Sequence, residues 1–190
     1  MKTIINLKSI MGLLFMLTML IGCKNETKTT TTPASTNKEV KKQGQAFIED
    51  DGSTPNVLQI AIGSADHTTL VAAVQAAELE NALVNAGPLM VFAPTNAAFD
   101  ALPEGTVATL LEPENKGALA NILKYHVTPG NYSKEFLKKF KKLGQANNQN
   151  VFVEVKGDDV YVGGAKIIAS VKAGNGIVHV IDKVMLPPEE

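Results

Sequence analysis

The sequence contains no tryptophan, no arginine and a single cysteine. Without arginine, the chain lacks the planar guanidinium that binds phosphates and carboxylates through two parallel hydrogen bonds. The absence of tryptophan removes one common platform for stacking sugars or bases. One cysteine excludes a disulfide within the chain, and a formal net charge of −1 gives no overall attraction to nucleic acid. These absences argue against a nucleic-acid-binding protein and against a disulfide-stabilised fold.

The amino-terminal residues resemble the signal of a bacterial lipoprotein. Lys2 and Lys8 form a positive region before a short apolar run, residues 10–21, which is shorter than the ~20 apolar residues that span a bilayer. The run ends in Leu-Ile-Gly-Cys, which is similar to the motif at which such signals are cleaved before the cysteine. We expect residues 1–22 to be removed and Cys23 to carry acyl chains that anchor the protein in the membrane. A signal anchor with an unmodified cysteine is the alternative.

Residues 23–52 are predicted to form a tether that begins with the acylated cysteine. Threonines cluster at 29–32, and few apolar side chains are available to offset the entropy lost on ordering. A flexible coil of this length spans roughly 30 Å, which would hold a domain away from the membrane surface.

Residues 53–190 have the pattern of one α+β domain, in which short helices precede a set of antiparallel strands. Apolar side chains first recur at helical spacing, and we expect Asp66 or Thr68 to cap the second helix and Asn96 to cap a later helical turn. The pattern predicts helical segments at 57–62, 70–77, 79–84, 99–102, 106–111 and 115–125, and a buried strand at 89–92.

The final third of the sequence changes to alternating apolar residues. Ser133 is predicted to cap a basic, amphipathic helix that runs from Lys134 to about Leu143. Exposed lysines of this helix either form a solvated face or bind an anionic surface; they are Lys138, Lys139, Lys141 and Lys142. Strands are predicted at 151–155, 160–162, 165–170 and 177–184.

Three segments, in this order and at these separations, resemble the signature of a fasciclin-like domain. They are Met-Val-Phe-Ala-Pro-Thr-Asn-Ala-Ala-Phe at 90–99, Ile-Leu-Lys-Tyr-His-Val-Thr-Pro-Gly at 122–130, and the glycine-flanked strand that ends in Met-Leu-Pro at 174–187. The resemblance implies a β-wedge or sandwich of antiparallel strands with several short helices. It also implies a non-catalytic role in adhesion or scaffolding at a cell surface.

The resemblance further implies roles for individual residues. In animal adhesion members, a tyrosine–histidine motif among branched apolar residues is implicated in receptor contact. Here the motif falls on Ile122, Leu123, Tyr125, His126 and Val127. The remaining family positions are expected to be structural: Pro94, Asn175, Gly176, His179 and Asp182. Two carboxylates that the family usually carries are replaced, by Asn96 in the central motif and by Ser170 before the last turn.

The three histidines, His67, His126 and His179, lie far apart in the sequence. Zinc sites usually contain at least one pair of ligands close in sequence, so we expect His126 and His179 to be structural and no metal or cofactor to be bound. No glycine-flanked serine elbow or metalloprotease motif is present, so we predict that the protein is not an enzyme.

The sequence therefore favours a lipid-anchored adhesion or scaffolding module of the bacterial cell envelope. It is expected to be a monomer that binds the membrane through its anchor and a surface protein or polysaccharide through its domain. Two alternatives remain open, namely a carrier of a small apolar ligand and an accessory module of an envelope enzyme. A carrier would have an enclosed apolar pocket.

Overall fold

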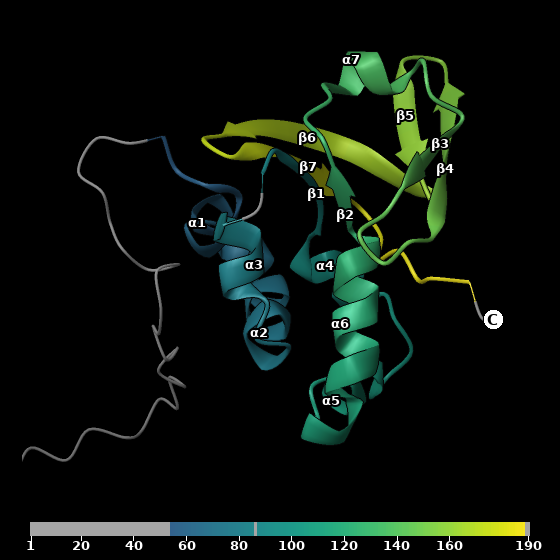
Figure 1. Ribbon diagram of the computed structural model, residues 1–190. Helices are drawn as coiled ribbons and strands as arrows, with labels where there is room; N and C mark the ends of the chain where they lie inside the picture. The colour runs from purple at the N-terminus through teal and green to yellow at the C-terminus, as the bar shows by residue number, and fades with distance from the viewer. Residues whose placement is uncertain (1–53, 86, 189–190) are drawn as a thin grey trace, which may run out of the picture. The chain divides into compact units, whose positions relative to one another are not determined.

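The computed structural model describes residues 54–85 and 87–188 (Figure 1). The expected signal peptide, Cys23 and the tether lie outside these residues. Within the part of the chain that is described, no helix is both long and apolar enough to cross a bilayer.

Short helices come first and strands dominate the second half of the domain, in agreement with the predicted α+β class. The elements are α1 (Val57–Ile62), the 3₁₀ helix η2 (Ala65–His67), α2 (Thr68–Ala76), α3 (Glu80–Asn85), β1 (Leu89–Pro94), α4 (Asn96–Asp100), α5 (Thr106–Leu110), η3 (Pro113–Asn115), α6 (Lys116–Tyr125), β2 (Val127–Pro129), α7 (Lys134–Leu137), β3 (Lys142–Gly144), β4 (Asn150–Lys156), β5 (Asp159–Val162), β6 (Ala165–Ala173) and β7 (Gly176–Ile181).

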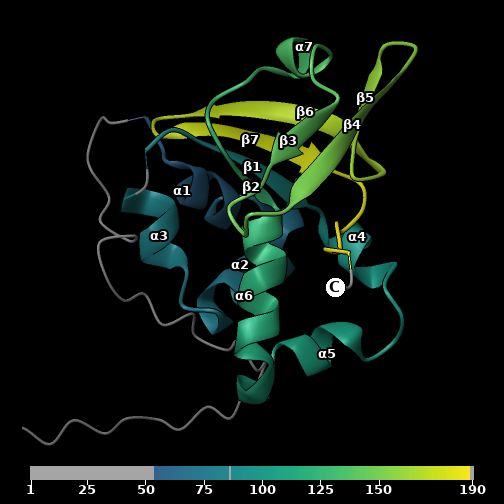
Figure 2. The same ribbon diagram turned by 45° about the vertical axis from the view of Figure 1, so that its right-hand side comes forward.

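The strands form one seven-stranded sheet in the order β2-β1-β7-β6-β5-β4-β3. All neighbours are antiparallel except β1 and β7, which run parallel. The sheet curls so strongly that its two edge strands approach each other, and the Ala146 amide donates to the Val127 carbonyl oxygen at 2.7 Å. The strands therefore almost close into a barrel, from which the β4–β5 hairpin projects (Figure 2).

Strand β1 separates two apolar cores, because all six of its residues are buried. Met90 and Phe92 point into the curled sheet, where they pack with residues of β3 to β7. Leu89, Val91 and Ala93 alternate to the opposite face and pack against α1, α2 and α6. Figure 1 shows these helices gathered on one side of β1 and β7. A strand covered on both faces reads in the sequence as a continuous apolar run, as residues 89–93 do.

The predicted helix from Lys134 to Leu143 is wrong beyond its first turn. Ser133 does cap it, since its hydroxyl accepts from the Phe136 amide at 3.3 Å, but helix α7 ends at Leu137. The chain then turns, and Leu143 enters β3 opposite Val151 of β4. Pairing with β3 satisfies backbone hydrogen-bonding groups along the edge of β4 that would otherwise lack partners. This pairing outweighs the helical tendency that the spacing of apolar residues predicts.

Two predicted caps also differ from those in the structure. The helical turn α4 is capped by Thr95, whose hydroxyl accepts from the Ala98 amide at 3.3 Å. Asn96 instead caps α2, because its Oδ1 accepts from the Thr69 amide at 3.1 Å. Neither Asp66 nor Thr68 serves as the cap of α2. The side chain that satisfies the start of α2 comes from a distant segment, which local spacing does not reveal.

His126 joins three parts of the domain. Its Nδ1 lies 2.8 Å from the Ile122 carbonyl oxygen, which can only accept, so Nδ1 carries the proton. Its Nε2 therefore accepts from the Met185 amide at 3.0 Å, and its own carbonyl accepts from the Phe92 amide at 2.9 Å. Complete burial lowers the pKa of His126 from 6.5 to about 4, against the opposing effect of the Ile122 carbonyl. The ring is thus neutral at pH 7 and connects α6 to the carboxyl-terminal segment, while the backbone carbonyl of the same residue binds β1.

We predict that acid destabilises the domain through His126. Because its folded pKa lies below its unfolded pKa, the stabilisation is complete above pH 6.5 and is lost as the pH falls toward 4. From pH 7 to pH 5, this one group should cost about 2 kcal/mol of unfolding free energy. Urea unfolding at both pH values should show a smaller acid-induced loss for His126→Gln than for the wild type. Equal losses in the two proteins would contradict the assignment.

Asn175 ties the helical layer to the turn before β7. Its Oδ1 accepts from the Val57 amide at 2.9 Å, at the start of α1, and its Nδ2 donates to the Leu83 carbonyl at 2.8 Å, in α3. The next residue, Gly176, has no room for a side chain, because a Cβ would collide with the Leu89 carbonyl oxygen. This turn therefore fixes both the helices and the parallel β1–β7 pair.

We expect Asn175→Ala to lower the unfolding free energy by ~1–3 kcal/mol, because it leaves a buried backbone donor and an acceptor without partners. Asn175→Asp keeps the acceptor for Val57 but sets a carboxylate oxygen against the Leu83 carbonyl oxygen, so it loses that hydrogen bond and adds repulsion. Thermal or urea unfolding should place both variants below the wild type. An alanine variant as stable as the wild type would show that the turn holds without this side chain.

Candidate functional site

The tyrosine–histidine pair that the resemblance links to partner contact lies in the interior. Tyr125 is 5% exposed and His126 is 3% exposed. The Tyr125 hydroxyl donates to the Asn150 carbonyl at 3.3 Å, and burial raises the pKa of the phenol. Of their apolar neighbours, Leu123 is buried, whereas Ile122 and Val127 are half-buried. The two central side chains of the motif therefore pack inside the domain and offer no surface to a partner.

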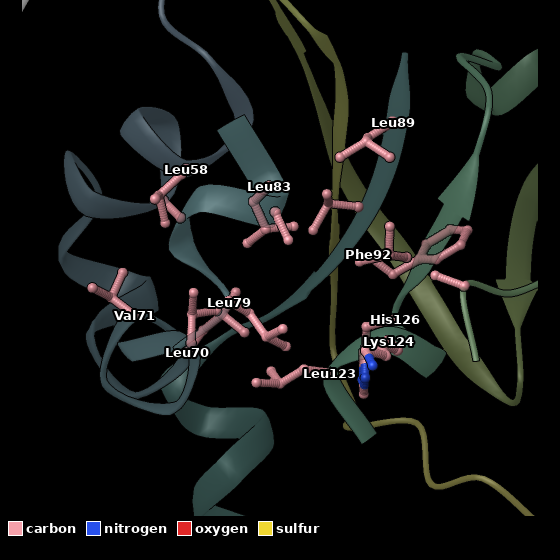
Figure 3. Close-up of a pocket in the computed structure, with 16 residues that line it drawn as sticks. Leu58, Leu70, Val71, Leu79, Leu83, Leu89, Phe92, Leu123, Lys124 and His126 are labelled. Atoms are coloured by element: carbon pink, nitrogen blue, oxygen red, sulfur yellow. The ribbon is translucent and has the colours of Figure 1, made fainter. Parts of the chain in front are cut away.

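Part of the same motif instead lines an apolar pocket of about 210 Å³ (Figure 3). Leu123 and His126 contribute from the end of α6, and Val127 contributes from β2. The opposite walls come from α1, α2, α3 and β1. The remaining lining residues are Leu58, Ala61, Leu70, Val71, Val74, Leu79, Ala82, Leu83, Leu89, Val91, Phe92, Lys124 and Ala146.

Two polar side chains reach this pocket. The buried one, His126, already uses both ring nitrogens in hydrogen bonds to the backbone. The other, Lys124, is exposed and forms no ion pair with any residue between 54–85 or 87–188. Ala82 and Ala146 are also exposed, so the pocket reaches the surface beside them. It is an aliphatic chamber with one cation among the residues at its opening.

In the sequence, most of these residues look like ordinary apolar positions of the predicted helices and strand. Helical spacing marks Leu70 and Val74 as buried, but it cannot show that the facing side chains leave space unfilled. The only local signal is size, because Ala61, Ala82 and Ala146 are small where larger side chains would fill the chamber. Lys124 gives no sign in the sequence that it differs from other surface lysines.

A second feature is a cluster of aromatic rings beside the lysines of segment 138–142. Tyr132, Phe136 and Phe140 pack together, with ring centroids 5.1 to 5.6 Å apart. Phe136 is 42% exposed, and the Lys139 ammonium lies 5.1 Å from the centre of its ring. We call the three rings together with the four lysines the aromatic–lysine surface; the lysines are Lys138, Lys139, Lys141 and Lys142.

The four lysines differ in their surroundings because they do not share one helix. Lys138 pairs with Glu135 at 2.9 Å. Lys141 and Lys142 are exposed and have no ion-pair partner among the described residues. Lys142 lies directly opposite Phe152 across the β3–β4 pair, and Phe152 is 68% exposed. At Lys142, an exposed ring and a cation that has no ion pair within residues 54–85 and 87–188 thus lie side by side in a sheet register rather than on a helical face.

His179 lies on β7, and its ring faces the segment that precedes α7. Its Nε2 lies 2.9 Å from the Tyr132 carbonyl oxygen and therefore carries the proton, so Nδ1 accepts from the Ser170 hydroxyl at 2.7 Å. Burial lowers the pKa of His179, opposed by the Tyr132 carbonyl. Ser170 thus provides a neutral hydrogen bond at the position where the resemblance leads one to expect an acid.

The other positions expected to be structural lie at strand ends. Pro94 is the buried last residue of β1, paired in register with Ile181. The Asp182 carboxylate accepts from the Lys166 amide at 2.8 Å. Across residues 54–85 and 87–188, no three histidine, cysteine or acidic side chains are grouped so that they could hold a metal ion.

Comparison with known proteins places these features in a family. The family model described as the fasciclin domain matches residues 65–187. Protein sll1483 of Synechocystis is 47% identical over 137 residues, covering 72% of this chain and 76% of that protein. The uncharacterized protein sll1735 of the same organism is 38% identical over 132 residues, covering 70% of this chain and 98% of that protein.

Animal relatives are longer. The transforming growth factor-beta-induced protein ig-h3 of Sus scrofa is 36% identical over 151 residues, which cover 77% of this chain and 22% of that protein. A solved pair of such domains from the insect cell adhesion molecule fasciclin I aligns with a TM-score of 0.47 and 21% identity, over 60% of this chain and 42% of that one. The chain described here belongs to the fasciclin domain family.

Proposed function

We propose that this fasciclin domain is a non-catalytic adhesion or scaffolding module of the bacterial cell envelope. Its proposed contact with a surface protein or polysaccharide is the aromatic–lysine surface. The observation that supports this choice is the exposed Phe136 ring, stacked at 5.6 Å on Tyr132 with the Lys139 ammonium 5.1 Å from its centre. Aromatic rings are enriched in binding interfaces because they bury much area for little conformational entropy.

Charge adds a second contribution to the same contact. Lys141 and Lys142 are exposed and have no ion-pair partner in the described ranges. Their positive charges can therefore attract an approaching partner that carries negative charge. Exposed charges of this kind mainly raise the rate of encounter, and salt screens them over ~8 Å at physiological ionic strength. The proposed partner therefore carries negative charge, as acidic polysaccharides and acidic protein surfaces do.

The proposed contact does not include Tyr125 or His126. Both side chains are buried and hydrogen-bonded to backbone groups, so contacting a partner would require local unfolding. The aromatic–lysine surface begins only a few residues later in the chain. It needs no rearrangement to be reached.

Reversing two lysines tests this surface. Lys141→Glu with Lys142→Glu should slow association several-fold and make binding less sensitive to salt. Lys172→Glu with Lys183→Glu changes the net charge by the same amount at two other exposed lysines without ion pairs among residues 54–85 and 87–188. Binding to an array of acidic polysaccharides and matrix proteins, with kinetics on the positive spots, measures both. If the two double variants behave alike, the site is not the aromatic–lysine surface.

Attachment to the membrane is proposed to depend on Cys23. The motif that ends at this cysteine follows a short apolar run, which supports cleavage and acylation there. Several acyl chains anchor a protein stably, whereas one chain binds only reversibly.

Replacing Cys23 with serine should therefore release the protein from the membrane fraction or leave the precursor uncleaved. Fractionation of cells followed by intact-mass measurement distinguishes the two outcomes. A Cys23→Ser protein that stays in the membrane at the mature mass would refute acylation at this residue.

A further inference from the structure

We propose that the apolar pocket beside α6 binds the chain of a free fatty-acid-like carboxylate, with Lys124 as the counter-ion at its opening. This site is a small-molecule site, separate from the aromatic–lysine surface. It therefore stands or falls independently of the adhesion proposed above.

The dimensions of the chamber favour a single unbranched chain. Its volume of about 210 Å³ lies below the roughly 300–1,000 Å³ of pockets that hold drug-sized molecules. Figure 3 shows leucine and valine side chains converging on it from both sides, between the helices and β1. Interiors normally leave few voids larger than a water molecule, and apolar voids stay dry and accept apolar guests. The chamber therefore suits a narrow hydrocarbon.

The polar groups around the chamber set the chemistry of the ligand. His126 has no free nitrogen, since Nδ1 donates to Ile122 and Nε2 accepts from Met185. The other buried walls are aliphatic apart from the ring of Phe92. A hydroxyl or amide placed deep inside would lose its hydrogen bonds to water without replacement. The buried part of the ligand must accordingly be apolar throughout.

The opening of the chamber supplies the charge. Lys124 is the one charged side chain in the lining, and it is exposed and unpaired within residues 54–85 and 87–188. A lysine stem can lie along apolar surface while its ammonium stays in water. A carboxylate at the end of a buried chain would meet this ammonium at the surface. Ala82 and Ala146 place only methyl groups at the opening, and among the described residues no acid lines the pocket to compete for the ammonium.

The chain length of the ligand provides the first test. Calorimetric titration of the full-length protein with hexanoate, octanoate and decanoate should show affinity rising about fourfold per added methylene until the chamber is full. Affinity should then level off as the chain outgrows the chamber. No binding, or affinity independent of chain length, would overturn the proposal.

Lys124 provides the second test. Lys124→Gln should weaken octanoate binding by about threefold to fivefold and leave the binding of octanol unchanged. Lys172→Gln, at an exposed lysine outside the pocket, is the matched control and should change neither. If Lys124→Gln weakens both ligands equally, or neither, Lys124 is not the counter-ion and the proposal fails.

Two substitutions of alanine by phenylalanine test whether the ligand binds in this pocket. Ala82→Phe places a ring at the opening and should abolish octanoate binding, whereas Ala72→Phe, at an exposed alanine of α2 that does not line the pocket, should leave it intact. Ala146→Phe repeats the block from the other side if Ala82→Phe melts at a lower temperature. Binding that survives both blocks would overturn the site. Octanoate binding seen only after Cys23→Ser would identify the occupant as the protein's own acyl chain, and would overturn the free carboxylate.

Discussion

The rest of the domain depends on the burial of β1 on both faces. Its backbone pairs with β2 on one side and, in parallel, with β7 on the other, so each neighbour fixes its register. Its alternate side chains then enter two different cores, Met90 and Phe92 in one, Leu89 and Val91 in the other. A one-residue slip would exchange the two sets. The close approach of β7 at Gly176, where no Cβ fits, makes the parallel pair possible.

The proposed pocket follows from the same arrangement. The helices that cover β1 are short, and two of them place small side chains, Ala61 and Ala82, in the lining of the pocket. Such a void costs stability, because its lining atoms lack partners on one side. Asn175 offsets part of this cost by hydrogen-bonding both α1 and α3 to the turn before β7. Apolar packing on β1 and β7 and these hydrogen bonds at the edge together hold the helical layer around the pocket.

The sequence predicted the class of fold and the order of most elements, because periodicity records which face each segment buries. It failed where a distant partner decided the outcome. Asn96 caps α2 rather than its own turn, and residues after Leu137 join β4 instead of extending a helix. The site depends on features that spacing does not record. Resemblance linked Tyr125 and His126 to partner contact, yet both side chains are buried, and no periodicity indicates an unfilled volume between correctly predicted helices.

The two proposed sites belong to different cores, and this separation bears on how they would act together. Tyr132 and Phe140 of the aromatic–lysine surface pack on the core inside the curled sheet. The pocket lies mainly in the core between β1 and the helices. Phe92 and His126 connect them, since both line the pocket while Phe92 also packs inside the sheet and stacks on His179 with centroids 5.7 Å apart. Coupling between sites requires a structural element that can adopt two arrangements. Strand β1 has little freedom to adopt a second one, because it is hydrogen-bonded on both edges and packed on both faces. Filling the pocket should therefore stabilise the domain without altering the aromatic–lysine surface.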